Sequence, residues 1–104
     1  MVIYGIKTCD TCRKALKALE GSQLHDIREN GFPEGLLDRA AARFGTALLN
    51  TKSTTWRGLD AAERDRPMLD LIAEHPTLMK RPLIETGGDL YLGWTEATRS
   101  ALGA

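Results

Sequence analysis

The fold is predicted by one stretch near the N-terminus, residues 2–19, which reads VIYGIKTCDTCRKALKAL. Val2 to Gly5 make a short β-type run, and Ile6 to Asp10 supply a polar turn after it. Beyond the turn, apolar residues recur at the helical spacing, at Cys12, Ala15, Leu16 and Leu19. The stretch therefore indicates a strand, a loop and a helix, with two cysteines where the loop meets the helix.

The segments that follow extend this unit. Gly21 and Ser22 are typical of a helix end, and Leu24 to Ile27 are expected to form a second strand, parallel to the first. Pro33 and Glu34 open a second predicted helix, which Gly45 ends. The apolar positions of that helix recur at the helical period, at Leu36, Leu37, Ala40, Ala41 and Phe44.

The second half of the chain is predicted to contain short helices and a β-hairpin. Residues 50–58, with Trp56 among them, are polar and are expected to form a loop, while residues 60–66 suit one helical turn. A helix is predicted at Met68 to Glu74. Residues 81–85 and 90–92 are two predicted strands around the paired glycines 87 and 88, and a last helix is expected from about Thr95 to Leu102.

This order of elements favours an α/β fold of the thioredoxin-like (glutaredoxin-like) kind. We expect a four-stranded mixed sheet with flanking helices and a helical insertion. The 104 residues suit one domain, spanning residues 1–104, because no repeat, linker or low-complexity tract divides them.

Composition excludes several classes of function. Fourteen basic residues balance fourteen acidic ones, so the formal net charge is zero and no broad positive field is available for nucleic acid or anionic lipid. No segment reads as a secretory leader or a membrane span. We therefore expect a cytoplasmic monomer without direct nucleic-acid or membrane binding, in which two cysteines three positions apart indicate redox or metal chemistry.

The pair Cys9-x-x-Cys12 has a clear chemical use at a strand-to-helix turn. Cys9 faces the unpaired amides and the positive dipole end of the helix, which favour its thiolate and lower its pKa. Cys12 lies one turn later and could attack a mixed disulfide formed on Cys9, releasing the partner as a thiol. Thr8 and Thr11 border Cys9 and could donate hydroxyl hydrogen bonds to the thiolate or cap the helix.

Three other interpretations of the cysteines stay open. The pair could be half of a zinc site, with His25 at a finger-like distance from Cys12 but no second histidine close behind. Cys12 could be only a small apolar residue on the inner helix face, which would leave Cys9 as the sole reactive thiol. Both thiols could also be inert.

Residues 5–15 (GIKTCDTCRKA), 48–52 (LLNTK) and 75–84 (HPTLMKRPLI) together resemble the arsenate reductase (ArsC)/Spx family. Within that family the chain is most similar to the YffB-type proteins, through residues 48–57, LLNTKSTTWR. In the glutathione- and glutaredoxin-linked arsenate reductases one cysteine attacks arsenate and three arginines hold the oxyanion. Cys9 matches that cysteine and Arg81 matches one arginine, whereas the other two arginine positions fall at Asn50 and near Gly93.

A lone arginine would bind a tetrahedral dianion weakly, so the resemblance favours a glutathione-dependent thiol reductase over an arsenate reductase. It implies no bound cofactor, glutathione as co-substrate, and a disulfide-containing protein, thioredoxin or glutaredoxin as further partners. An Spx-like redox-sensing regulator that binds RNA polymerase is the other alternative. The resemblance also implies that the Arg81–Pro82 bond is cis, with backbone polar groups beside Cys9. We expect the catalytic residues to be Cys9, Cys12 and Arg81, and the substrate-binding residues to be Thr8, Thr11, Asn50 and Pro82.

Overall fold

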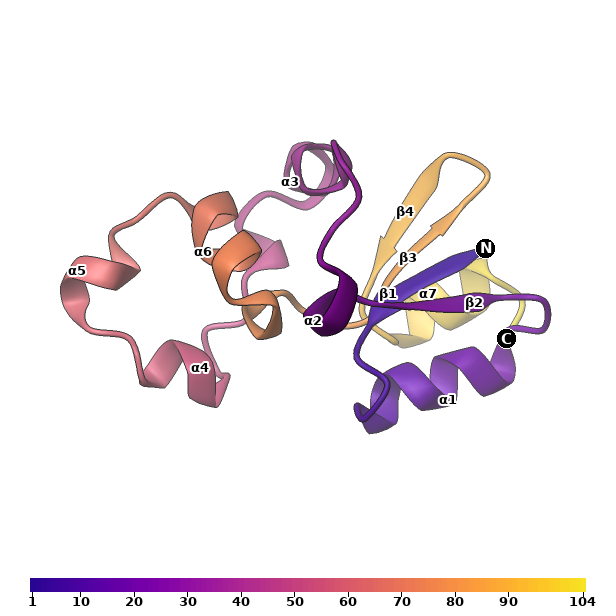
Figure 1. The fold of residues 1–104 in the computed structure, drawn as a ribbon. Coiled ribbons are helices and arrows are strands. Elements are labelled where there is room, and N and C mark those ends of the chain that lie inside the picture. The colour runs from indigo at the N-terminus through magenta and orange to yellow at the C-terminus, as the bar shows by residue number, and fades with distance from the viewer. The chain divides into compact units, whose positions relative to one another are not determined.

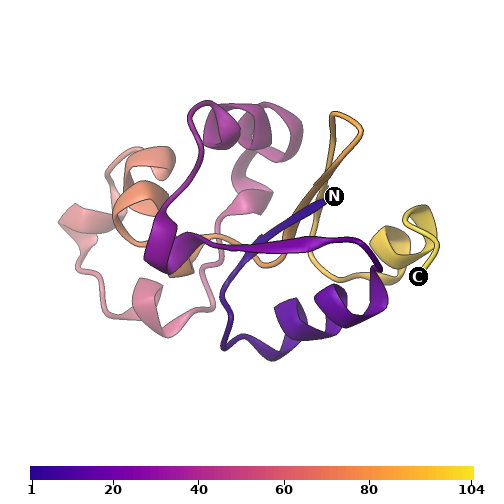
Figure 2. The ribbon, with the colours of Figure 1, turned by 45° about the vertical axis from the view of Figure 1, so that its right-hand side comes forward.

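The computed structural model describes all residues, 1–104, and divides into two compact units. The first unit is built from both ends of the chain, Met1–Asn30 and Arg81–Ala104, and the second is the intervening segment Gly31–Lys80. Figures 1 and 2 show both termini in the first unit, which also holds the four strands. None of the helices is both long and apolar enough to cross a membrane.

The first unit contains a four-stranded mixed sheet, as predicted. Its strands are β1 (Val2–Gly5), β2 (Gln23–Asp26), β3 (Leu83–Thr86) and β4 (Asp89–Leu92), in the spatial order β2-β1-β3-β4. β1 pairs in parallel with β2 and antiparallel with β3, and β3 pairs antiparallel with β4. The connection from β1 to β2 is α1 (Asp10–Ala18), which runs alongside the sheet in Figure 1. Two further helices, α2 (Ile27–Asn30) and α7 (Glu96–Ala101), complete the unit.

The core of this unit lies between one sheet face and the helices. Leu24, Ile3, Ile84 and Tyr91 are in register across the four strands and so share one face. Ala15 and Leu19 of α1 pack against Ile3 and Ile84 in one cluster, and Leu16, Trp94 and Leu102 cover its margin. Full burial of an isoleucine side chain stabilises a fold by about 2 kcal/mol. The apolar residues that recur at the helical spacing in the sequence are thus the ones that α1 turns toward the sheet.

The hairpin forms at the paired glycines, also as predicted. Gly87 and Gly88 have φ angles of 58° and 85°, so both central residues of the turn lie in the left-handed region. A two-residue turn of this kind matches the twist of the two strands that it joins, and glycine adopts it without steric cost.

The second unit is helical. It contains α3 (Leu36–Phe44), α4 (Thr54–Arg57), α5 (Ala61–Arg64) and α6 (Met68–Glu74), with 3-10 helices at Gly45–Leu48 and Pro76–Leu78. The backbone segments around Leu49 and Met79 form an antiparallel bridge. Hydrogen bonds from Asn50 N to Leu78 O (2.7 Å) and from Lys80 N to Leu48 O (2.9 Å) flank that bridge. These contacts join the middle of the unit to its C-terminal end.

Several sequence-based boundaries were wrong. The strand expected at residues 81–85 begins at Leu83 and ends at Thr86. Residues 50–58 were predicted to be a loop, but 54–57 form α4, because the Ser53 hydroxyl accepts from Trp56 N (3.1 Å) and caps the helix. The second strand ends at Asp26 instead of Ile27, which begins α2. The helix expected from Pro33 begins at Leu36, because Gly35 before it has a φ of 80°.

Gly5 is the place where the sheet and α1 approach most closely. A β-carbon built at Gly5 would overlap Sγ of Cys12 and lie 3.1 Å from its Cβ. We therefore expect Gly5→Ala to lower the free energy of unfolding by about 1–3 kcal/mol, measured by urea denaturation. In Gly5→Ala/Cys12→Ala the offending sulfur is absent, so the double variant should lose less stability than the two single variants summed.

Gly58→Ala is the matched control for this prediction. A β-carbon there would meet only the carbonyl oxygens of Thr54 and Thr55 at 3.5 Å, an ordinary contact, at a φ of −79°. Its effect on stability should stay within about 0.5 kcal/mol. If the losses in free energy of unfolding of the Gly5 and Cys12 variants were strictly additive, the predicted steric contact between the two residues would be contradicted.

Candidate functional site

Cys9 lies at the end of a tight turn and at the start of α1. Its amide donates to the carbonyl of Ile6 (2.9 Å), which closes the turn Ile6–Cys9, and its carbonyl accepts from Arg13 N (3.0 Å). Cys9 is thus the N-cap residue of α1, with an extended backbone (φ −81°, ψ 121°). Neither Thr8 nor Thr11 takes that position. Cys9 is partly exposed, whereas Cys12 is buried.

The surroundings of Cys9 favour its thiolate. Partial burial raises the pKa of the Cys9 thiol, but hydrogen bonds from the amide and thiol of Cys12 and from Arg81, with the charge of Arg81, outweigh that effect and lower it. The Cys9 side chain forms no helix-capping hydrogen bond. The net effect of its neighbours is to favour the ionised sulfur, which is the nucleophilic form.

Cys12 has the opposite character. Its side chain is fully buried, on the helix face that meets Gly5 of β1. Burial, together with the hydrogen bond and negative charge of the neighbouring Cys9 thiolate, raises the pKa of Cys12 to about 11. Cys9 is therefore the thiol that ionises first and attacks a substrate, while Cys12 beside it stays protonated at neutral pH.

Arg81 and Pro82 come to this site from the other end of the chain. The Arg81–Pro82 bond is cis, which confirms the expectation from the family resemblance. Pro82 is buried, and its carbonyl accepts from Gly93 N (2.8 Å), just after β4. Through a hydrogen bond and its charge, the Arg81 guanidinium helps to lower the pKa of Cys9. The structure therefore brings together the three residues expected to be catalytic.

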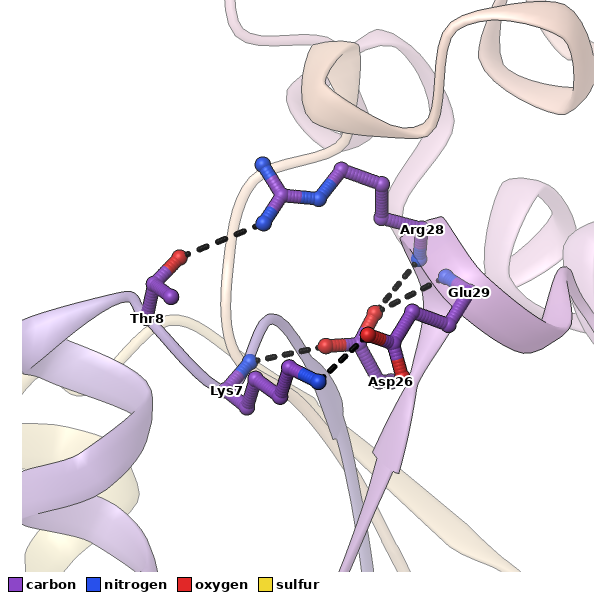
Figure 3. A network of polar contacts seen from close by, with 5 residues as sticks. All are labelled: Lys7, Thr8, Asp26, Arg28 and Glu29. Atoms are coloured by element: carbon purple, nitrogen blue, oxygen red, sulfur yellow. Dashed lines mark hydrogen bonds and ion pairs between the residues drawn. The ribbon is translucent and has the colours of Figure 1, made fainter.

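Figure 3 shows a polar network next to the Cys9 turn that sequence reasoning missed. The Asp26 carboxylate accepts hydrogen bonds from the backbone amides of Lys7, Arg28 and Glu29 at 2.9–3.0 Å. The signal was present in the sequence, because an aspartate three residues before a glutamate, Asp26 and Glu29, is a pattern of helix starts.

The predicted substrate-binding residues are placed differently from one another. Thr8 lies in the Cys9 turn, and its hydroxyl accepts from Arg28 Nη2 at 3.4 Å. Thr11 is exposed on the first turn of α1. Asn50 belongs to the second unit, where its Oδ1 accepts from Lys52 N (3.1 Å) and its carbonyl accepts from the Ser53 hydroxyl (3.0 Å). Substrate binding by these residues stays a prediction.

The zinc interpretation gains no support from the structure. No three side chains of His, Cys, Asp or Glu lie together as ligands of a metal site would. His25, the residue at a finger-like distance from Cys12, instead lies on β2 with its ring 5.3 Å from that of Tyr4.

Comparisons with known proteins agree with the fold. A family model described as "ArsC family" matches residues 4–102. An uncharacterized protein of Haemophilus influenzae is 41% identical, over 92% of this chain and 92% of its own length. A solved structure named YffB superposes with a TM-score of 0.88 at 33% identity, covering 99% of this chain and 98% of that one. The global transcriptional regulator Spx of Bacillus subtilis is 28% identical over 92% of this chain and 81% of its own.

The two thiols should differ sharply toward alkylation. Cys9 should be modified by iodoacetamide with a pH midpoint below 9.0, while buried Cys12, with a pKa of about 11, stays unmodified through neutral pH. Because a lowered pKa means more thiolate at pH 7, Arg81→Gln should raise the Cys9 midpoint and slow modification at that pH. Peptide mass mapping across pH measures both thiols.

Arg99→Gln is the control for this experiment. Arg99 belongs to the same unit but lies over the ring of Trp94, 5.9 Å from its centre. Its replacement should leave the Cys9 midpoint unchanged. An equal midpoint in wild type and Arg81→Gln would contradict the role of Arg81.

Proposed function

This chain belongs to the ArsC family of arsenate reductase-related proteins, and we propose that it is a glutathione-dependent thiol-disulfide oxidoreductase. One observation carries the proposal: an accessible Cys9 sulfur has a buried second thiol, Cys12, and an arginine, Arg81, directly around it. An accessible thiolate suits disulfide exchange, and a second thiol one helical turn away can resolve the mixed disulfide that forms.

In the first proposed step the Cys9 thiolate attacks a sulfur of a disulfide substrate. A new S–S bond forms between Cys9 and that sulfur, the old S–S bond breaks, and the other half leaves as a thiolate. Water then protonates the leaving group. The electron pair that forms the new bond comes from Cys9, so the protein is half-oxidised at this stage.

The second step uses Cys12, and the first step prepares it. Part of the raised pKa of Cys12 comes from the negative charge of Cys9. That charge disappears once Cys9 is in a mixed disulfide, so Cys12 loses its proton more easily than before. The Cys12 thiolate attacks Cys9 sulfur, forms the Cys9–Cys12 disulfide and releases the second half of the substrate as a thiol. Two molecules of glutathione would restore the dithiol and leave as glutathione disulfide.

Arg81 has two uses in this mechanism. Its hydrogen bond and charge stabilise the attacking thiolate. After attack, the sulfur of Cys9 is neutral and the guanidinium is available to an anionic group of the bound half-substrate, such as a carboxylate of glutathione. The same residue therefore favours ionisation before the first step and orients the adduct after it.

Trapping with glutathione disulfide tests the proposal. Wild-type protein should lose two hydrogens as the internal disulfide forms, Cys12→Ala should accumulate one glutathione adduct on Cys9, and Cys9→Ser should form neither product. Alanine is chosen at position 12 because a serine hydroxyl would be buried there. Intact mass and peptide mapping measure the products. Adduct formation by Cys9→Ser as readily as by Cys12→Ala would rule the mechanism out.

Arsenate reduction is the second candidate, and the family membership favours it. A tetrahedral dianion binds best to several forked guanidinium donors. Of the three family positions for such an arginine, this sequence keeps only Arg81. We therefore expect arsenate to cause little NADPH oxidation in the presence of glutathione, glutaredoxin and glutathione reductase, under conditions where a small disulfide is reduced readily.

The similarity to Spx makes a redox-sensing regulator a third candidate. Reversible Cys9–Cys12 oxidation would serve as its switch. Pull-down of RNA polymerase by the oxidised protein but not by the dithiol form would favour regulation. Disulfide turnover without such binding would favour the oxidoreductase.

A further inference from the structure

Asp26 is the one charged residue among the buried side chains of this chain, with 6% of its surface exposed. A buried carboxylate is stable only when its oxygens have hydrogen-bond donors. Here all three donors are backbone amides. Oδ2 accepts from Lys7 N (2.9 Å), while Oδ1 accepts from Arg28 N (2.9 Å) and Glu29 N (3.0 Å). The carboxylate thus joins two separate backbone segments, and its bond to Lys7 spans 19 residues.

One of these segments is the turn that presents the nucleophile. The hydrogen bond from Cys9 N to Ile6 O closes this turn, in which Lys7 and Thr8 are the central residues. The amide of Lys7 takes no part in that closing bond and points instead to Asp26 Oδ2. Asp26 therefore binds the turn at Lys7, two residues before Cys9, without being part of the turn itself.

The other segment is α2, which Asp26 caps through Arg28 N and Glu29 N. Side chains of the same two residues reach back to the turn. Glu29 forms an ion pair with Lys7, and Arg28 Nη2 donates to the Thr8 hydroxyl at 3.4 Å. Both contacts are exposed, so each contributes little by itself. We call the three hydrogen bonds from the Lys7, Arg28 and Glu29 amides to Asp26 the brace. Because the carboxylate is buried, these bonds contribute more than the two exposed contacts do.

We propose that Asp26 is a positioning residue for Cys9: by binding the Lys7 amide, its carboxylate holds the Ile6–Cys9 turn so that the Cys9 sulfur faces the Cys12 amide and Arg81. The inference rests on the proposed function in that Cys9 is the nucleophile. Asp26 acts through the backbone. Hydrogen bonds to sulfur depend steeply on distance and angle, so a loosened turn withdraws the thiolate from its donors.

Asp26→Asn tests this inference because it keeps the shape and removes one acceptor. The amide oxygen of asparagine can replace Oδ1, which receives two bonds, and its NH2 group then faces the Lys7 amide, donor against donor. We expect the pH midpoint of Cys9 alkylation to rise by about half a unit to one unit, which is a roughly three- to tenfold lower thiolate fraction at pH 7. Asp26→Ala, which loses all three bonds, should raise it at least as much.

Two controls separate positioning from other effects. Glu29→Gln removes the exposed ion pair with Lys7 and leaves the Asp26 bonds in place, so the Cys9 midpoint should not change. Leu90→Ala weakens the same sheet on β4, the edge strand that β3 separates from β1 and the turn. It should lower stability against urea while the Cys9 midpoint stays at the wild-type value.

The outcomes distinguish this inference from the proposed function. If Asp26→Asn lowers stability yet alkylates with the wild-type midpoint, Asp26 is structural only and the inference is overturned. A wild-type midpoint equal to that of a free thiol would overturn the proposed function instead. If Asp26→Asn does not fold, hydrogen exchange of the wild type decides: a slowly exchanging Lys7 amide supports the brace, and an unprotected one refutes it.

Discussion

The close contact of Cys12 with Gly5 sets how near α1 lies to β1, and the geometry of the reactive cysteine depends on that distance. The missing side chain at Gly5 leaves room for the sulfur of Cys12, which a β-carbon at position 5 would overlap. With α1 this close to β1, the amide and the thiol of Cys12 are both hydrogen-bond donors to the sulfur of Cys9. A helix start displaced by one side chain would separate the two sulfurs and remove the donors that favour the thiolate.

Two chemically identical side chains thus acquire opposite properties within three positions. Cys9 is partly exposed and surrounded by donors, whereas Cys12 is buried and lies beside an anion. The difference arises from solvent and neighbours alone. It also sets the sequence of the two steps, because the Cys9 charge that raises the pKa of Cys12 is lost only after Cys9 has reacted.

Local patterns predicted most of the fold, and what they missed is contact between distant segments. The helical spacing of residues 12–19 and the glycine pair at 87 and 88 reflect contacts close in sequence, and both predictions were confirmed. The resemblance supplied the cis bond at Arg81–Pro82, which no local pattern would have shown. The hydrogen bond between Asp26 and the Lys7 amide, by contrast, spans 19 residues. Hydrophobic periodicity indicates which face of a helix or strand is apolar, and it does not indicate which backbone amide a distant carboxylate will bind. The sequence therefore indicated that Cys9 would be reactive but not what holds its turn in place.

The first unit is assembled from the two ends of the chain, and this has a consequence during synthesis. Residues 1–30 can pair β1 with β2, but Arg81 and the strand after it do not yet exist when those residues leave the ribosome. The share of thiolate stabilisation that Arg81 supplies therefore arises only after most of the chain has been made. Until Arg81 is in place, the Cys9 thiolate lacks the hydrogen bond and the positive charge of that guanidinium.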